Sequence, residues 1–213
     1  MYRYILFDLD GTLTDPGIGI TNAVMYALKK FHIEVEDRTE LYKFIGPPLL
    51  DSFEKYYGLS KEESKQALQY YREYFKPYGL YENTVYEGIV ELLTELKDRG
   101  LKIILATSKP EPFAVEILKH FDLEKYFDFI AGATMDEKRV KKADVIQYAL
   151  EAYGIKDLKS AIMIGDREHD IFGARQNGLA SIGVLYGYGN YQELQLAGAD
   201  YIVEKPEEIL GII

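Results

Sequence analysis

The sequence predicts an α/β protein: a parallel sheet with a helical segment inserted after the first strand. Along most of the 213 residues, short apolar runs alternate with segments of helical periodicity, which is typical of a parallel sheet joined by crossover helices. The runs are apolar at nearly every position, as in strands that are covered on both faces. Residues 16–83 break the alternation, because they contain helical patterns and no convincing strand.

The elements of the sheet follow from these runs in order. The predicted strands are residues 4–7, 102–106, 127–131, 161–164, 181–185 and 201–203. Helices are predicted between the later strands, at residues 90–96, 113–121 and 145–153. Gly100 and Gly154 follow the first and the last of these helices, and glycine is the usual residue just past a helix C-terminus.

Three further helices are predicted in the inserted segment, at residues 20–31, 49–57 and 61–75. Two turn signals accompany them, the Gly-Pro-Pro string at residues 46–48 and the Lys-Pro-Tyr-Gly string at residues 76–79. We therefore expect a core domain made of residues 1–15 and 84–213, and a helical domain made of residues 16–83.

Composition narrows the functional classes. The 25 basic and 35 acidic residues give a formal net charge of −10, with no basic run, so nucleic acid is not expected as a partner. The chain has no cysteine, which excludes disulfides and thiolate metal sites. Its start has no signal-peptide pattern, and no apolar run approaches the ~18 residues that span a membrane. We expect a cytoplasmic protein without a membrane partner, either a monomer or a homodimer.

Asp8 and Asp10 directly follow the first predicted strand. Side chains two residues apart in an extended chain point to the same side. Both carboxylates are therefore expected at one spot, at the carboxyl end of the strand, where open parallel sheets bind ligands. Gly11 then allows a sharp turn, and Thr12 offers a hydroxyl and a backbone N–H. An EF-hand is excluded, because the glycine comes two residues early and a strand precedes the pair.

Other predicted strands also end in polar side chains. Thr107 and Ser108 follow one of them, and Ser108 is also a candidate N-cap of the next helix. Asp166 follows another strand, and Asp170 comes four residues later. Basic residues precede the last predicted core helix, which is an unfavourable place for them unless an anion lies near. Residues 185–190 (LYGYGN) are predicted to form a turn or loop near the site.

Together these motifs resemble the four motifs of the haloacid dehalogenase superfamily. They are Asp8-Leu9-Asp10-Gly11-Thr12, Thr107, a downstream lysine and Gly165-Asp166-x-x-x-Asp170, and the match covers the whole chain. The strings FIGPPL, ATSKP, KKADVI and IGDREHDIFGA are similar to those of phosphoglycolate phosphatase-like members, especially the subgroup labelled 5′-nucleotidase. The resemblance implies a Rossmann-like α/β core with a small helical cap, and the hydrolysis of a small phosphate ester.

The resemblance also implies the catalytic roles. Asp8 is the expected nucleophile, which forms an aspartyl-phosphate, and Asp10 is expected to protonate the leaving group and later to take a proton from water. Thr107 is expected to donate a hydrogen bond to the phosphoryl group, and a lysine to neutralise its charge. The subgroup string KKADVI points to Lys142 as this lysine, ahead of Lys141 and, more distantly, Arg139.

The same resemblance implies Mg²⁺ as the cofactor and a small phosphate ester as the partner. The implied metal ligands are Asp8, the backbone carbonyl of Asp10, Asp166 and Asp170, of which Asp170 binds through water or supports the other ligands. The predicted substrate-binding residues are Gly11, Thr12, Ser108 and Gly46. Gly46 belongs to the turn at residues 44–49, which is a candidate specificity loop.

Two other functions stay open at this point. A sugar phosphomutase would form the same phosphoaspartate and return the phosphoryl group to a sugar. A non-catalytic phosphate-binding protein could share the fold, since fold does not imply function. Asp10 favours phosphoryl transfer over dehalogenation, because the dehalogenases of the superfamily lack an acid there. The substrate stays open between phosphoglycolate and a nucleoside monophosphate, with a phosphotyrosine or a sugar phosphate as further alternatives.

Overall fold

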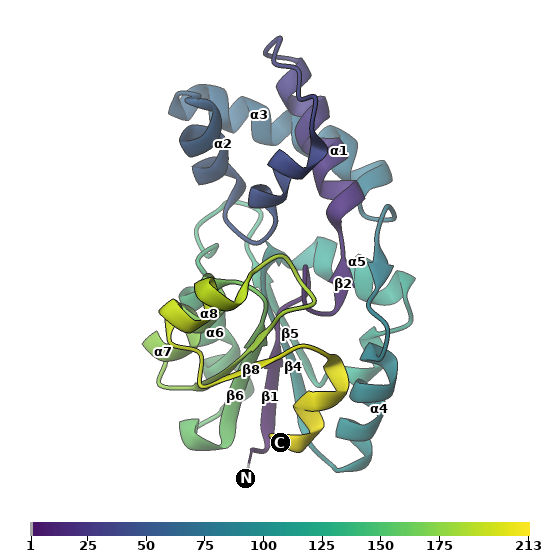
Figure 1. The fold of residues 1–213 in the computed structure, drawn as a ribbon, viewed down its shortest axis with the longest axis vertical. Coiled ribbons are helices and arrows are strands. Elements are labelled where there is room, and N and C mark those ends of the chain that lie inside the picture. Colours follow the sequence, from purple (N-terminus) through teal and green to yellow (C-terminus); the bar gives the residue numbers. More distant parts are fainter. Residues whose placement is uncertain (1) are drawn as a thin grey trace. The chain divides into compact units, whose positions relative to one another are not determined.

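The computed structural model describes residues 2–213, which fold as two compact units (Figure 1). The core unit comprises the chain up to Thr14 together with Val85–Ile213, and the helical unit is Asp15–Thr84. The limits of the helical unit thus lie one residue outside the limits of 16–83 that the sequence predicts.

The core unit contains a six-stranded sheet in which every neighbouring pair of strands is parallel. The strands are β1 (Tyr4–Phe7), β4 (Lys102–Pro110), β5 (Phe129–Ala133), β6 (Ala161–Gly165), β7 (Ala180–Val184) and β8 (Tyr201–Val203). Their order in space is β5-β4-β1-β6-β7-β8, so β1 lies between β4 and β6. The predicted parallel α/β fold is confirmed.

Two strands differ by more than one residue from their predicted bounds. β5 begins at Phe129, after Asp128, whose carboxylate accepts hydrogen bonds from the Ile103 N–H and the Lys97 ammonium, both at 3.0 Å. β4 continues to Pro110 instead of ending at residue 106, and its register against β5 shifts after Ala106. A bulge of this kind redirects side chains and is frequent beside functional sites.

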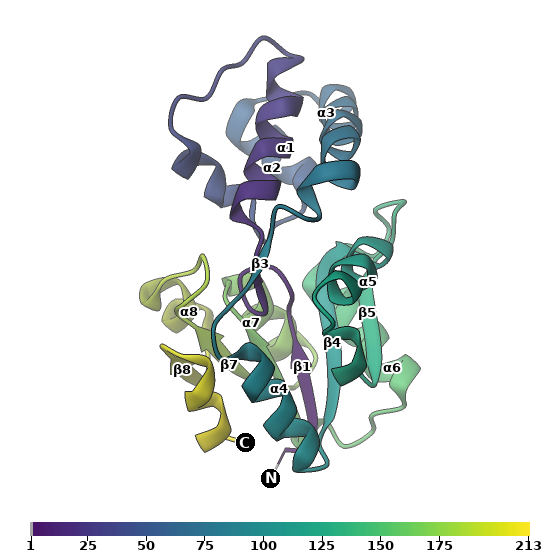
Figure 2. The ribbon, with the colours of Figure 1, turned by 90° about the vertical axis from the view of Figure 1, so that its right-hand side faces the viewer.

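Helices cover both faces of the sheet (Figure 2). On one face lie α6 (Lys142–Tyr153) and α7 (Glu168–Gln176), and on the other lie α4 (Ile89–Asp98) and α5 (Glu111–His120). α8 (Tyr191–Ala197) packs against α7. The sequence does not predict α8, because seven residues are too few to establish a helical period.

The core beneath α6 shows why the strands are apolar throughout. Leu6, Ile104 and Met163 are register partners on β1, β4 and β6. They form one buried cluster with Val145 and Ala149 of α6. Because alternate strand residues point to opposite faces, the residues between them bury against the other helical layer.

The helical unit begins and ends at two short paired strands, β2 (Thr14–Asp15) and β3 (Thr84–Val85). Between these strands the chain forms α1 (Gly17–Lys29), a 3₁₀ helix (Arg38–Phe44), α2 (Leu49–Tyr57), α3 (Lys61–Tyr74) and a π-helical turn (Phe75–Gly79). The turn predicted at residues 76–79 is wrong, because the chain continues there as a helix. The π-helical turn brings Gly79 against Gly19 so closely that a Cβ atom on Gly19 would overlap the Gly79 carbonyl.

Among residues 2–213, no helix combines the length and the apolar character that crossing a bilayer requires.

Candidate active site at the carboxyl ends of the strands

Three neighbouring strands bring their polar ends to one edge of the sheet. Asp8 directly follows β1, and its N–H donates a hydrogen bond of 2.9 Å to the Ile164 carbonyl of β6. Thr107 lies in the irregular end of β4, and Asp166 follows β6. The order β4-β1-β6 therefore places these residues side by side, although they are far apart in the sequence.

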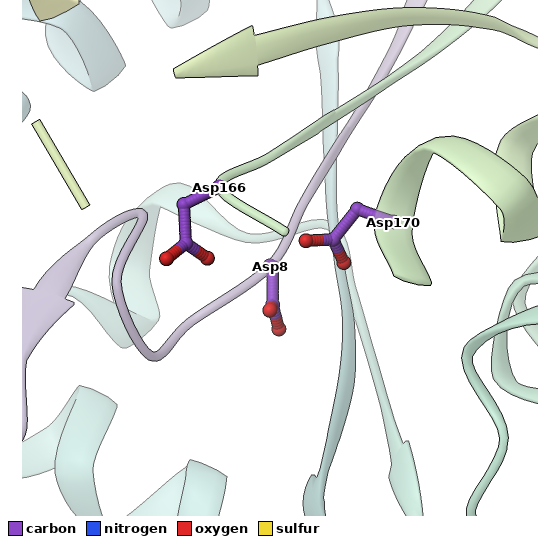
Figure 3. A group of neighbouring side chains, drawn as sticks. All are labelled: Asp8, Asp166 and Asp170. Atoms are coloured by element: carbon purple, nitrogen blue, oxygen red, sulfur yellow. The ribbon is translucent and has the colours of Figure 1, made fainter. Parts of the chain in front are cut away.

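Asp8, Asp166 and Asp170 form a buried acidic group (Figure 3). One carboxylate oxygen from each lies within 4.8 Å of those of the other two. Asp170 comes from the first turn of α7, where its Oδ2 accepts the Arg167 N–H at 3.1 Å. Asp166 Oδ2 accepts the Tyr188 N–H at 2.7 Å. Its Oδ1 is buried and has no hydrogen-bond partner within residues 2–213.

This arrangement fits a divalent metal ion. Magnesium and calcium are hard cations that prefer oxygen ligands, carboxylates above all. An uncompensated carboxylate oxygen inside a protein is costly, and the free Oδ1 of Asp166 is such an oxygen in the part of the chain that the structure describes. The three side chains that the sequence predicts as metal ligands are thus brought together.

Burial governs the protonation of the acidic group. Burial raises the pKa of Asp166 well above its ordinary value, and the neighbouring Asp170 and Asp8 carboxylates raise it further. Burial also raises the pKa of Asp170 to about 6, against the opposing effect of the Lys142 ammonium. A positive ion beside these carboxyl groups would favour their ionised forms.

Lys142 is the candidate lysine that reaches the carboxylates. It is the first residue of α6, and its Nζ lies 2.7 Å from Asp8 Oδ1 and 2.8 Å from Asp170 Oδ1. Burial lowers the pKa of Lys142, but the two carboxylates outweigh burial and raise it. Lys141 is exposed, and Arg139 lies against Glu111 and the Tyr148 ring.

Lys109 is a site residue that the sequence analysis missed. Its Nζ lies 2.5 Å from Asp10 Oδ2, and both side chains are largely buried. Burial raises the pKa of Asp10, although Lys109 acts to lower it. The position of Lys109, two residues after Thr107, was the available signal, since alternate residues of a strand share a face. The carboxylate of Asp10 does not belong to the three-aspartate group, and the ligand role of its backbone carbonyl stays a prediction.

Gly11 and Thr12 form the turn that follows Asp10. Gly11 has a φ of +81°, and a Cβ atom there would overlap the carboxylate of Asp166, so the turn requires glycine. The sequence suggested that the N–H of Thr12 is available to a ligand, but this N–H donates to the Leu9 carbonyl at 3.2 Å. Its hydroxyl is buried and has no hydrogen-bond partner in the described chain.

Thr107 is buried at the site, and its Oγ1 accepts the Lys109 N–H at 3.2 Å. Ser108 is half-buried and does not cap α5 as the sequence suggested, because β4 runs on to Pro110, which takes the N-cap position. Gly46 lies in the helical unit, in the turn before α2, with a φ of +102°. The substrate-binding roles of Ser108 and Gly46 stay predictions.

The loop after β7 closes against Asp166, so its predicted place near the site is confirmed. Cβ atoms on Gly187 and Gly189 would each overlap atoms of Asp166, which explains the closely spaced glycines. The N–H of Tyr188 holds the Asp166 carboxylate. The Tyr186 hydroxyl is buried without a hydrogen-bond partner among residues 2–213, and burial raises its pKa.

The sequence and the fold of this chain are similar to those of known proteins. The family model described as haloacid dehalogenase-like hydrolase matches residues 5–184. A 5′-nucleotidase of Pseudomonas aeruginosa is 47% identical over 194 residues, 91% of this chain and 87% of the relative. The tyrosine-protein kinase PtkA of Mycobacterium tuberculosis is 37% identical over 99% of this chain and 73% of its own length. The crystal structure of a predicted phosphatase from Clostridium acetobutylicum is 53% identical, with a TM-score of 0.97 over 100% of this chain and 98% of that one.

Proposed function

Because this chain belongs to the haloacid dehalogenase-like hydrolases and is a phosphatase of that family, we propose that it hydrolyses a small phosphomonoester through a phosphoaspartate on Asp8. The observation that carries the proposal is the setting of Asp8. Its carboxylate is buried at the end of the central strand, paired with Lys142 and grouped with two further aspartates. A nucleophilic carboxylate needs such a setting to approach an anionic phosphoryl group.

In the first step, a carboxylate oxygen of Asp8 attacks phosphorus and the ester P–O bond breaks. Asp10 gives its proton to the departing alkoxide. The Thr107 hydroxyl donates to a phosphoryl oxygen, and the Lys142 ammonium offsets the charge on the transferring group.

In the second step, a water molecule attacks the phosphorus of the phosphoaspartate while Asp10 takes a proton from that water. The bond between Asp8 and phosphorus breaks, inorganic phosphate leaves, and both aspartates return to their starting states. The same residue thus serves as acid and then as base, which balances the proton over one turnover.

The proposed cofactor is Mg²⁺, held by Asp8, Asp166 and Asp170 together with the backbone carbonyl of Asp10. When bound, the ion supplies positive charge beside the nucleophile and the phosphoryl oxygens. The loop after β7 holds Asp166 in place through the Tyr188 N–H, and the backbone N–H of Arg167 does the same for Asp170. Such supporting contacts keep ligands oriented for a metal.

The proposed substrate class is a nucleoside 5′-monophosphate. The support is the 5′-nucleotidase that is 47% identical over 91% of this chain. Phosphoglycolate, whose leaving group is glycolate, is the alternative substrate. We propose that the helical unit acts as a cap that excludes water and selects the leaving group, with the turn at residues 44–49 as its specificity loop.

Phosphate release from a substrate panel tests the proposal. Nucleoside 5′-monophosphates, phosphoglycolate, sugar phosphates and an aryl phosphate would be assayed with Mg²⁺ and with a chelator. We expect a 5′-nucleotide to be preferred, chelation to abolish turnover, and Asp8→Asn to lower kcat by at least about 1,000-fold. Transfer of the phosphoryl group to a sugar would favour the mutase. An inactive parent enzyme that still binds phosphate would favour the binding protein.

A further inference from the structure

We propose that Lys109 is a positioning residue that holds Oδ2 of Asp10, so that Oδ1 is the oxygen that exchanges the proton with the leaving group. This inference rests on the proposed function, because it assigns a role within the proton transfer by Asp10. It concerns a lysine of the string ATSKP to which the sequence alone assigned no role.

The two carboxylate oxygens of Asp10 have different surroundings. Oδ2 lies 2.5 Å from Lys109 Nζ, and the side chains of Lys109 and Asp10 are 5% and 11% exposed. Oδ1 is buried and has no hydrogen-bond partner within residues 2–213. A carboxyl group that is held at one oxygen has a fixed orientation and keeps its other oxygen unpaired. Proton transfer within hydrogen-bond reach requires such a fixed orientation.

The backbone of β4 places Lys109 for this task. The register shift after Ala106 interrupts the regular pairing of β4 with β5, and the Lys109 N–H donates to Thr107 Oγ1 at 3.2 Å. The same short segment thus carries the proposed phosphoryl-binding hydroxyl and the lysine that holds Asp10. A displacement of this segment would affect both groups.

The two buried lysines contact different carboxylates. Lys142 Nζ lies within ion-pair distance of Asp8 and Asp170, and Lys109 Nζ within that distance of Asp10. Lys142 therefore faces the nucleophile and the proposed metal ligands, while Lys109 faces the proposed acid. This division predicts that loss of Lys109 impairs the protonation of the leaving group more than the binding of the phosphoryl group.

The leaving group of the substrate separates these roles. A 4-nitrophenolate leaves without protonation, whereas the alkoxide of a nucleoside needs a proton from Asp10. For Lys109→Met, we expect kcat for a nucleoside 5′-monophosphate to fall about 30-fold or more, and kcat for 4-nitrophenyl phosphate to fall no more than about threefold. KM should change little for both. Asp10→Asn should show the same selectivity, and the double variant should lose little more than Asp10→Asn alone.

Two further variants make the comparison decisive. Lys119→Met removes an exposed lysine of α5 and should leave both activities unchanged. Lys109→Gln keeps an N–H donor at the position, so it should retain more nucleotide hydrolysis than Lys109→Met. If the methionine variant does not fold, as judged by circular dichroism, the ratio of the two kcat values is read from the glutamine variant.

Equal losses on both substrates, or a raised KM with unchanged kcat, would overturn the proposal and assign Lys109 to substrate binding. No loss on either substrate would also overturn it. A parent enzyme that releases phosphate from neither compound would contradict the proposed function itself, and this outcome is distinct because it needs no variant.

Discussion

Charge balance at the level of single residues favours a cation at the site. Asp8, Asp10, Asp166 and Asp170 are buried together with Lys109 and Lys142. When all six are ionised, as they are after Asp10 has given its proton away, four carboxylates face two ammonium groups, which leaves two uncompensated negative charges in a region shielded from water. One divalent ion neutralises that excess. The repulsion between closely spaced carboxylates is therefore relieved when a metal ion binds between them.

Replacing Lys142 tests this balance directly. Lys142→Met removes the ammonium between Asp8 and Asp170, so we expect kcat/KM to fall at least about 100-fold, because charge on the phosphoryl group is no longer offset. The measurement is steady-state phosphate release with saturating Mg²⁺. Lys141→Met is the matched control, since the Lys141 side chain is exposed. Similar losses in both variants would contradict the assignment of Lys142.

Glycines in the elements around the site make room for the charged side chains. A Cβ atom on Gly165, the last residue of β6, would overlap the carboxylate of Asp170 on α7. A Cβ atom on Gly173 of α7 would lie 2.9 Å from Cγ of Lys142 on α6. The packing of β6, α6 and α7 is therefore set by the side chains that line the acidic group, and not by the apolar core alone.

Gly165→Ala should damage the metal site without unfolding the sheet. The added methyl group displaces Asp170, so we expect the apparent Mg²⁺ affinity to weaken by about 10–100-fold. The measurement is the Mg²⁺ dependence of phosphate release, supported by calorimetric titration. Gly211→Ala serves as the control, because a Cβ atom there meets nothing within 4 Å. An unchanged Mg²⁺ dependence in Gly165→Ala would show that Asp170 is not a ligand.

An element could be predicted from the sequence when the residues that mark it are adjacent in the chain. β1 and β6 could be predicted together with the aspartates that follow them, because apolar runs and strand-end carboxylates are adjacent in the sequence. The end of β4 could not, because its bulge is a feature of pairing with β5, and Lys109 was missed with it. The π-helical turn replaced a predicted turn, because the contact between Gly19 and Gly79 joins residues sixty positions apart.

At the scale of the whole molecule, metal binding should couple to folding stability. In the metal-free protein the pKa of Asp170 is about 6, above the value of about 3.9 of an exposed aspartate. A carboxyl group whose pKa is raised by folding opposes folding as the pH rises through that interval, because the unfolded chain ionises first. Mg²⁺ bound to the ionised carboxylates of the folded state reverses this effect.

We therefore expect Mg²⁺ to raise the Tm by roughly 5–10 °C near pH 7 and by less than half of that near pH 5, where protons compete for Asp170. Thermal unfolding with and without saturating Mg²⁺ at the two pH values is the measurement. Asp166→Asn, which removes a ligand charge, should abolish most of the shift near pH 7. An equal shift at both pH values would contradict binding to carboxylates of raised pKa.

The paired strands β2 and β3 bear on how such an enzyme diversifies. The helical unit is one uninterrupted stretch of chain, and it starts and finishes at neighbouring backbone positions. A single genetic exchange of that stretch would leave all six strands of the large sheet, and every aspartate of the acidic group, in their original order. Related enzymes with this chain order could thus keep the residues of phosphoryl transfer unchanged, while recombination replaces the helical unit and with it the substrate selectivity.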